Sequence, residues 1–346
     1  MKKDILGYSL IELEQLVTET YGMPKFRAKQ IYQWLHKEMV DDFETMSNVP
    51  KELRAKLATD YMIPTLGVVK KFQSKDGSAK YLFDIGHDTI VESVLMDNNY
   101  GYSICVSTQV GCKMGCTFCA SHIGGFEKNL STGEILKQVY TIQKDLDKKI
   151  SNLVIMGIGE PMDNYDNVMR FIRNLSDEAG LNLSQRSITV STCGIVPKMY
   201  DLAEEGLAVT LAISIHAGDD VTRKRIMPIA NAYTMDEIVA AAHNYFEKTK
   251  RRVSYEYVMI KEVNDHLAQA RLLGKRLEKT NSHVNLIPLN PVTEAGYTNT
   301  VDKHIKEFAR ILESYNVDTT IRRNQGQDIE AACGQLRKTH KEEAAL

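Results

Sequence analysis

The feature that most constrains the fold of this chain is an alternation of strand-like and helix-like segments from about residue 101 onward. The strand-like runs are Tyr102–Val106, Asn152–Gly157, Ser187–Ser191, Val209–Ile215, Val253–Ile260, His283–Leu289 and Val317–Ile321. Such alternation predicts an α/β fold whose parallel sheet is closed or partly closed into a barrel. In folds of this kind, the chemistry takes place at the carboxyl ends of the strands.

The segment before this alternation predicts two smaller parts. Ser9 and Glu12 fit a capping box at the start of a first helix, and further helices are expected over Arg27–Glu38 and Lys51–Thr59. Short strands separated by turn signals follow, at Leu66–Phe72, Lys80–Phe83 and Thr89–Met96. We therefore predict a helical domain over 1–62, linking β-strands over 63–98, a partial barrel over 99–324 and a C-terminal tail over 325–346.

Composition limits the classes of partner and compartment. The 346 residues carry a formal net charge of −2, so a nucleic-acid partner would need a local arrangement of basic groups. No signal-like segment is visible, and no apolar run approaches the roughly 20 residues of a membrane span. Six cysteines in a long chain without a signal peptide favour reduced thiols. We expect a cytoplasmic protein with no membrane partner.

Three cysteines in the order Cys112-x-x-x-Cys116-x-x-Cys119 follow the first strand of the alternation. Thiolates at this spacing can bind three corners of a [4Fe-4S] cube and leave one iron open to S-adenosylmethionine (SAM). Gly111 and Gly115 leave room for the chain to fold around such a cube. The alternative is a zinc ion, for which His122 is a candidate fourth ligand.

A glycine-rich segment, Met156–Pro161, follows the second strand. Its glycines let the backbone approach a ligand closely, and Glu160 places a carboxylate at the end of the strand. Alone, this segment is typical of a simple turn. With an open-cornered cluster expected one βα unit earlier, a ligand-binding role becomes the better interpretation.

Several motifs, in their order along the chain, resemble the RlmN family, the radical SAM methyltransferases that modify C2 of adenine in 23S rRNA and tRNA. They are Gly111–Cys119, Gly157–Pro161, Ser191–Pro197, Ser214–His216 and Asp328–Gln335, with Phe26–Trp34 in the helical N-terminus. The resemblance covers nearly the whole chain. It implies a radical SAM partial barrel, an RNA-binding N-terminal domain, cytoplasmic location, and both a [4Fe-4S] cluster and SAM as cofactors.

The resemblance also assigns ligands. It implies that Cys112, Cys116 and Cys119 hold the cluster, and that Gly159 and Glu160 contact the amino group of SAM. The remaining SAM contacts that it implies are Ser191, Ser214, Ile215, His216 and Asn290. These positions lie in or just after the ends of expected strands, where a barrel places its site.

Two further cysteines and one carboxylate acquire roles by the same resemblance. A lone cysteine is usually a small buried hydrophobe, which is our interpretation of Cys193. The resemblance implies instead that Cys333 accepts a methyl group from one SAM, and that a second SAM supplies the radical that activates it. Cys105 would then attack the sulfur of Cys333 and leave a disulfide, and Glu92 is the candidate acceptor of the C2 proton. Without the resemblance, Glu92 could equally be an exposed strand residue.

The expected partners are 23S rRNA, tRNA and a low-potential electron donor such as a flavodoxin or ferredoxin, acting on a monomer. Local basic groups are candidate phosphate contacts, although charge runs are usually solvated faces. They are Lys25, Arg27 and Lys29; Lys51, Arg54 and Lys56; Arg223, Lys224 and Arg225; Lys250, Arg251 and Arg252; and Arg322 and Arg323. Three alternatives stay open: a C8-adenine methyltransferase of the antibiotic-resistance type, a radical SAM enzyme acting on a small molecule or peptide, and a non-catalytic zinc-stabilised RNA-binding protein.

Overall fold

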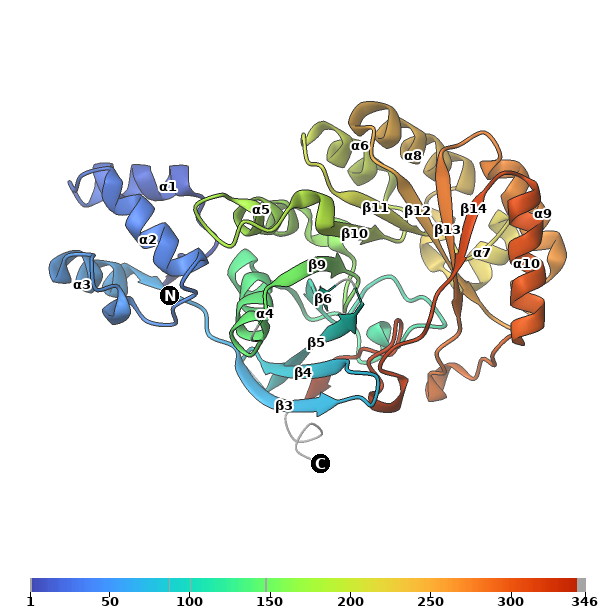
Figure 1. Cartoon of the computed structure of the whole chain (residues 1–346), viewed down its shortest axis with the longest axis horizontal. Helices are drawn as coiled ribbons and strands as arrows, with labels where there is room; N and C mark the ends of the chain where they lie inside the picture. Colours follow the sequence, from blue (N-terminus) through green and yellow to red (C-terminus); the bar gives the residue numbers. More distant parts are fainter. Residues whose placement is uncertain (1, 87, 100, 147, 341–346) are drawn as a thin grey trace.

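The helical N-terminus packs around its own apolar cluster in the computed structural model, which describes residues 2–86, 88–99, 101–146 and 148–340. Its helices are α1 (Leu10–Gln15), continued by a π-helical turn, η1 (Leu16–Thr20), then α2 (Phe26–His36) and α3 (Lys51–Asp60). The capping box of Ser9 and Glu12 is present at the start of α1, as the sequence predicts. Figure 1 shows these helices projecting from one end of the molecule. His87 and the last six residues of the predicted tail lie outside the described residues.

A mostly parallel sheet forms the centre of the molecule and confirms the predicted α/β partial barrel. Along the sheet, neighbouring parallel strands follow the order of the sequence from β6 to β14. They are β6 (Gly101–Cys105), β9 (Ile150–Ile155), β10 (Ile188–Thr192), β11 (Thr210–Ser214), β12 (Val253–Met259), β13 (Ser282–Pro288) and β14 (Asp318–Ile321). Every residue of β12 is buried, as expected for a strand covered on both faces.

The linking strands extend this sheet instead of forming a separate one. They are β3 (Gly67–Gln73), β4 (Ala79–Asp84) and β5 (Thr89–Asn98), and β5 pairs antiparallel with β6. Near the end of the described chain, β15 (Thr339–His340) returns to pair with β5. The C-terminal segment therefore crosses back to the antiparallel end of the sheet, as the red ribbon beside β3–β5 shows in Figure 1.

Helices connect the parallel strands and pack on the outer side of the sheet (Figure 1). They are α4 (Thr132–Lys144), α5 (Tyr165–Ser176), α6 (Val196–Glu204), α7 (Asp220–Ile226), α8 (Met235–Thr249), α9 (Leu267–Leu277) and α10 (Asp302–Ser314). A capping box of Ser131 and Glu134 begins α4. No helix in the described ranges is long and apolar enough to cross a membrane.

Shorter elements complete the chain. They are the pair β1 (Lys3–Asp4) and β2 (Tyr61–Met62), the pair β7 (Gln109–Val110) and β8 (Lys128–Asn129), and the 3-10 turns η2 (Phe43–Thr45), η3 (Ala120–His122), η4 (Pro161–Asn164), η5 (Gln185–Ser187), η6 (Pro228–Asn231), η7 (Thr293–Ala295) and η8 (Gln327–Ile329).

The helical N-terminus docks on α4 through buried polar side chains, one of which reaches an exposed carboxylate. His36 of α2 and Tyr140 of α4 are fully buried, and His36 Nδ1 lies 2.8 Å from Tyr140 Oη. Lys137, one turn earlier on α4, donates to the carbonyl of Val40 (3.0 Å) and to the Asp41 carboxylate (2.5 Å). Buried polar groups require such partners, so these contacts fix how the N-terminal helices sit on the sheet.

Candidate active site

The three clustered cysteines lie on a loop whose base is closed by a small antiparallel ribbon. β7 lies between β6 and the cysteines, β8 follows the cysteines, and the two strands pair with each other. The loop is also tied to α7, because the Thr117 N–H donates to the carbonyl of Ile226 (3.0 Å). A side chain at Gly111 would collide with the carbonyl of Gly125 across the loop, so the glycine permits this close return.

A cavity of about 160 Å³ opens where the parallel strands end. Its lining unites nearly all residues that the sequence proposes for cluster and SAM: Cys112, Cys116, Cys119, Gly159, Glu160, Ser191, Ser214, His216 and Asn290. Ile215 is the exception, because its side chain is buried in the apolar core. Cys333 lines the same cavity from the C-terminal segment.

The chemistry of the thiols fits an iron–sulfur cluster. Burial raises the pKa of Cys112 to about 12, and it also raises the pKa of Cys116 and of Cys119. A bound metal lowers the pKa of a thiol, and thiolates are the ligands that iron–sulfur clusters use. Cys116 and Phe118 pack against an apolar group that includes Cys193, Ile226 and Met227.

His122 is occupied by a contact within the cysteine loop. Its Nδ1 donates to the carbonyl of Cys119 (2.5 Å), because a carbonyl can only accept. Across the described ranges, no three His, Cys, Asp or Glu side chains converge as ligands of one metal ion.

Glu160 closes the floor of the cavity at the end of β9. One carboxylate oxygen accepts the N–H of Cys193 (2.7 Å) and the other accepts that of Met162 (3.0 Å). Burial raises the pKa of Glu160, and these N–H groups partly oppose the rise. Gly157 precedes it, and a Cβ there would lie 2.6 Å from the carbonyl of Val106. The close approach of the β6 and β9 ends therefore requires glycine.

His216 presents a neutral ring to the cavity. Its Nδ1 accepts the N–H of Val258 (3.0 Å), which leaves Nε2 as the protonated nitrogen. Burial, helped by the charge of Arg223, lowers the pKa of His216 to about 3. The residue has φ of 52°, in the left-handed region, where non-glycine residues gather at functional sites. The edge of its ring meets Phe118, with centroids 4.9 Å apart.

Arg223 corrects one expectation from the sequence. The sequence groups it with Lys224 and Arg225 as a candidate phosphate contact, yet its side chain is fully buried. Its Nε donates to the carbonyl of Ile215 (3.1 Å), and its Nη2 donates to those of Cys193 (2.6 Å) and Ser214 (3.3 Å). In the described part of the chain, Nη1 is buried without a hydrogen-bond partner. The guanidinium therefore belongs to the cavity wall and not to an RNA-binding surface.

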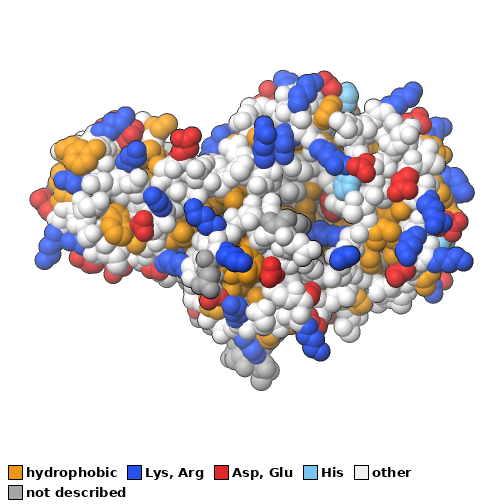
Figure 2. Space-filling view, viewed as in Figure 1, with side chains coloured by type: hydrophobic (Ala, Val, Ile, Leu, Met, Phe, Trp, Pro, Cys, Tyr) orange, Lys and Arg blue, Asp and Glu red, His pale blue; other side chains and the backbone are white. Residues whose placement is uncertain are grey.

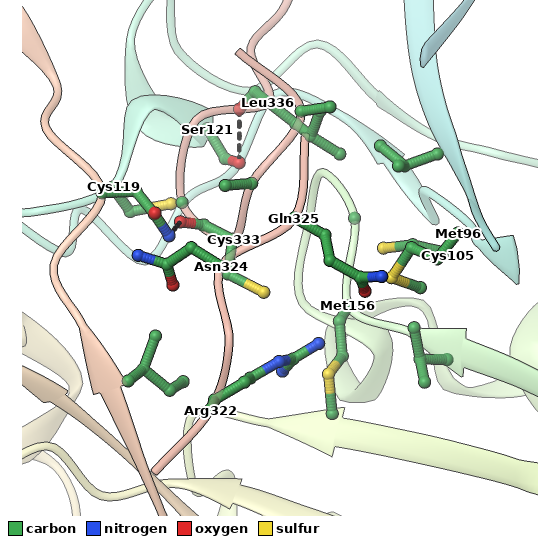
Figure 3. A pocket seen from close by; sticks show the side chains of 18 of the residues that line it. Met96, Cys105, Cys119, Ser121, Met156, Arg322, Asn324, Gln325, Cys333 and Leu336 are labelled. Carbon is green, nitrogen blue, oxygen red and sulfur yellow. Dashed lines mark hydrogen bonds between the residues drawn. The ribbon is translucent and has the colours of Figure 1, made fainter. Parts of the chain in front are cut away.

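The loop that carries Cys333 is held from several sides. Asn290 Nδ2 donates to the carbonyl of Cys333 (3.0 Å), and the Ala120 N–H donates to that of Gly334 (2.7 Å). Ser121 Oγ donates to the carbonyl of Leu336 (2.8 Å), as Figure 3 shows. The amide of Asn290, a proposed SAM contact, thus also supports the loop.

Cys105 faces Cys333 across a second, smaller cavity of about 70 Å³. Figure 3 shows both side chains pointing into this space, with Met156 and Arg322 beside them. Cys119 also lines it, so the two cavities share a wall. Burial raises the pKa of Cys105 to about 12. Its thiol is therefore protonated at neutral pH, and attack on another sulfur requires a proton acceptor.

Glu92 is buried on β5, so it is not the exposed strand residue that the sequence left open. Its Oε1 lies 3.6 Å from Lys80 Nζ, and its Oε2 accepts the N–H of Arg337 (3.1 Å). Burial raises the pKa of Glu92, while Lys80 and the Arg337 N–H oppose the rise. Val94 and Met96, on the same face of β5, line the smaller cavity. Among the described residues, Glu92 is not part of the wall of this cavity.

Five residues of the other basic groups form ion pairs with acidic side chains. Lys25 pairs with Glu14, Arg54 with Glu44, Lys56 with Glu52, Lys250 with Glu247 and Arg252 with Asp318. Figure 2 shows basic and acidic side chains interspersed over the visible face. Arg322 lines both cavities instead of the outer surface. Sequence reasoning also missed Lys80, because nothing local to it indicates a partner 250 residues away.

Comparisons with known proteins agree with this geometry. The radical SAM superfamily matches residues 106–272, and the ribosomal RNA large subunit methyltransferase N-terminal domain matches residues 3–63. A probable dual-specificity RNA methyltransferase RlmN of Lachnoclostridium phytofermentans is 52% identical over 340 residues, covering 98% of this chain and 95% of that protein. A protein of the same description from Clostridium acetobutylicum is 48% identical over 343 residues and covers 99% of both chains.

A solved structure shows the same fold. The crystal structure of a radical SAM methyltransferase from Sphaerobacter thermophilus superposes with a TM-score of 0.91 at 40% identity, covering 96% of this chain and 99% of that one.

Proposed function

The chain belongs to the RlmN family of radical SAM methyltransferases, and we propose that it methylates C2 of an adenosine in 23S rRNA and in tRNA. One observation carries this proposal. Cys333 lines both cavities, so it stands between the three clustered cysteines and Cys105. A radical SAM enzyme acting on a small molecule would need the cluster, but it would not need this pair of thiols.

The residues present fit a [4Fe-4S] cluster and SAM. Cys112, Cys116 and Cys119 would hold the cluster. The SAM contacts would be Gly159, Glu160, Ser191, Ser214, His216 and Asn290, with Ile215 contributing only backbone. When bound, these groups supply the methyl group and the one-electron chemistry that an unactivated ring carbon requires. The protein residues position these groups and exclude water.

Cys333 is the proposed methyl carrier. Its thiolate would take a methyl group from one SAM, which leaves as S-adenosylhomocysteine, and the S-methylcysteine would present that carbon to the adenine. Cys105 is the proposed resolving thiol. After losing its proton, it would attack the sulfur of Cys333, so that an S–S bond forms as the bond from that sulfur to the transferred carbon breaks. The electron pair of the broken bond would stay with that carbon, which takes up a proton to become the methyl group. A cellular thiol reductant then restores both cysteines.

Glu92 is the proposed acceptor of the C2 proton. It lies on the face of β5 that carries Val94 and Met96 toward the space between the two thiols. Arg337 covers its Oε2 in this structure, so the carboxylate would reach a substrate only after residues near 337 shift. General-base catalysis needs reach as well as a suitable pKa.

The division of labour along the chain follows from these roles. Residues 1–62 would bind RNA, 63–98 would link, 99–324 would hold cluster and SAM, and 325–346 would carry Cys333. The remaining expectations are a monomer in the cytoplasm, reduced by a flavodoxin or ferredoxin. Adenine C2 is reached most easily in an unpaired or extruded base.

The test is peptide mass spectrometry on anaerobically reconstituted protein given SAM. The tryptic peptide from Asn324 to Arg337 contains Cys333 and no other cysteine. A methyl increment that requires the intact cluster is the expected result. An unmodified peptide from protein that still cleaves SAM would refute the two-cysteine mechanism. Mapping the methyl group on product RNA separates C2 from C8, and iron analysis separates a cluster from zinc.

A further inference from the structure

We propose that Lys80 is a positioning residue that ties the loop carrying Cys333 to the Glu92 carboxylate. It thereby holds Cys333 opposite Cys105. The proposal rests on the proposed roles of these two cysteines and of Glu92. None of the sequence motifs described above includes Lys80, and none assigns it a part in the reaction.

Lys80 makes two contacts that join distant parts of the chain. Its Nζ donates to the carbonyl of Glu330 (3.3 Å), three residues before Cys333, and lies 3.6 Å from Glu92 Oε1. The ammonium group has three N–H donors and no acceptor, so it can serve a carbonyl and a carboxylate together. It thus bridges β4, β5 and the Cys333 loop.

The loop closes over this ion pair from its other end. The N–H of Arg337, four residues after Cys333, donates to Glu92 Oε2 (3.1 Å). Both oxygens of Glu92 are therefore engaged, one by Lys80 and one by the loop backbone. Residues 330–337 span the two contacts, and Cys333 lies between them. These two contacts consequently fix the segment on both sides of the Cys333 thiol.

Because the bridge is buried, it depends on both Lys80 and Glu92. The side chains of Lys80 and Glu92 are 9% and 4% exposed. In such surroundings, removing one partner of an ion pair leaves an uncompensated charge, so the pair and its covering loop depend on each other. The ring of Phe72 lies 5.3 Å from Lys80 Nζ and forms one wall. Lys70, on β3, approaches the same ring at 5.0 Å.

The experiment measures how well the loop presents Cys333 to Cys105. Anaerobically reconstituted full-length protein is equilibrated in glutathione buffers. One glutathione disulfide oxidises the Cys105 and Cys333 thiols to one disulfide and is reduced to two glutathione molecules. Alkylation followed by mass spectrometry of the Asn324–Arg337 peptide gives the equilibrium constant. The variant is Lys80→Met. The matched control is Lys70→Met, which removes a lysine that contacts the same ring, that of Phe72.

The expected result is that Lys80→Met lowers this equilibrium constant at least about tenfold, which is about 30 mV for a two-electron couple. Lys70→Met should leave it unchanged, and Lys80→Arg should restore most of the loss because it keeps a cation with several donors. An unchanged constant in Lys80→Met would overturn the proposal. Equal losses in Lys80→Met and Lys70→Met would also overturn it, because the effect would then not depend on Glu92 or Glu330.

Cluster content and the urea midpoint show whether Lys80→Met folds. Should it not, Glu92→Gln replaces it, and a constant equal to wild type in that variant would overturn the proposal. The measurement is independent of methyl transfer. An unmethylated Cys333 in wild-type protein would refute the proposed function, while the effect of Lys80 on the disulfide would still be measured.

Discussion

Replacing His36 by glutamine should flatten the pH dependence of stability. His36 is fully buried, and burial together with the charge of Lys137 lowers its pKa to about 3. In the unfolded chain, the ordinary value of about 6.5 applies. Between these values, the unfolded state binds more protons, so the free energy of unfolding falls as pH falls below about 6.5. Glutamine can still hydrogen-bond Tyr140, but it does not titrate.

The size of the effect follows from the two pKa values. Between pH 7.5 and pH 5.0, protonation of the unfolded chain at this one site should remove about 2 kcal/mol from the free energy of unfolding of wild type. His36→Gln should lack that loss. Because His36 joins α2 to α4, the same pH range should weaken the docking of the N-terminal helices.

Urea unfolding at several pH values between 5.0 and 7.5 measures this difference, with wild type and variant at matched cluster content. The matched control is His243→Gln, on the exposed side of α8, where the ring is solvated in both states. Its pH dependence should follow wild type. If His36→Gln loses as much stability as wild type toward pH 5.0, the buried neutral histidine is not the origin of the effect.

Three further predictions concern the active site. Cys105→Ala should accumulate a covalent enzyme–RNA adduct, because no thiol releases the product; a denaturing gel without the shifted band would argue against the resolving role. Arg223→Met should lower the midpoint potential of the cluster by at least about 60 mV, a tenfold change for one electron, because it removes a buried cation near Cys116. A redox titration without SAM measures this, and an unchanged potential would contradict the reasoning. Lys80→Met should move the acid limb of the pH–rate profile to higher pH. Burial already raises the pKa of Glu92, and the variant removes the lysine that opposes that rise. An acid limb that stays in place or moves to lower pH would show that it does not report the ionisation of Glu92.

Local pattern predicted the elements well, and the cluster ligands that it suggests share one cavity. The strand-like run Val253–Ile260 differs from β12 by one residue, and Cys112, Cys116 and Cys119 meet at one cavity. Each of these features is set by residues close together in the sequence, such as the largely apolar and aromatic run of β12 or the short spacing of the three cysteines. Contacts between distant segments were beyond this reasoning. The pairing of β15 with β5 and the hydrogen bond from Lys80 to the carbonyl of Glu330 depend on how the C-terminal segment returns to the antiparallel end of the sheet.

Arg223 shows where the sequence held a signal that charge alone obscured. It was grouped with Lys224 and Arg225 because the three cations are adjacent. Successive residues on a helix point about 100° apart, so Arg223, Lys224 and Arg225 together span about 200° and do not all lie on one narrow face. Asp219 caps α7, and Thr222, Arg223 and Ile226 are its buried residues. Arg223 and Ile226, three residues apart, lie on one helical face, and the structure shows both of them buried. A cation on the buried face of a helix needs an acceptor, and here backbone carbonyls at the ends of the barrel strands provide it. The side of the helix on which each basic residue lies should therefore be checked before a basic run is assigned to RNA binding.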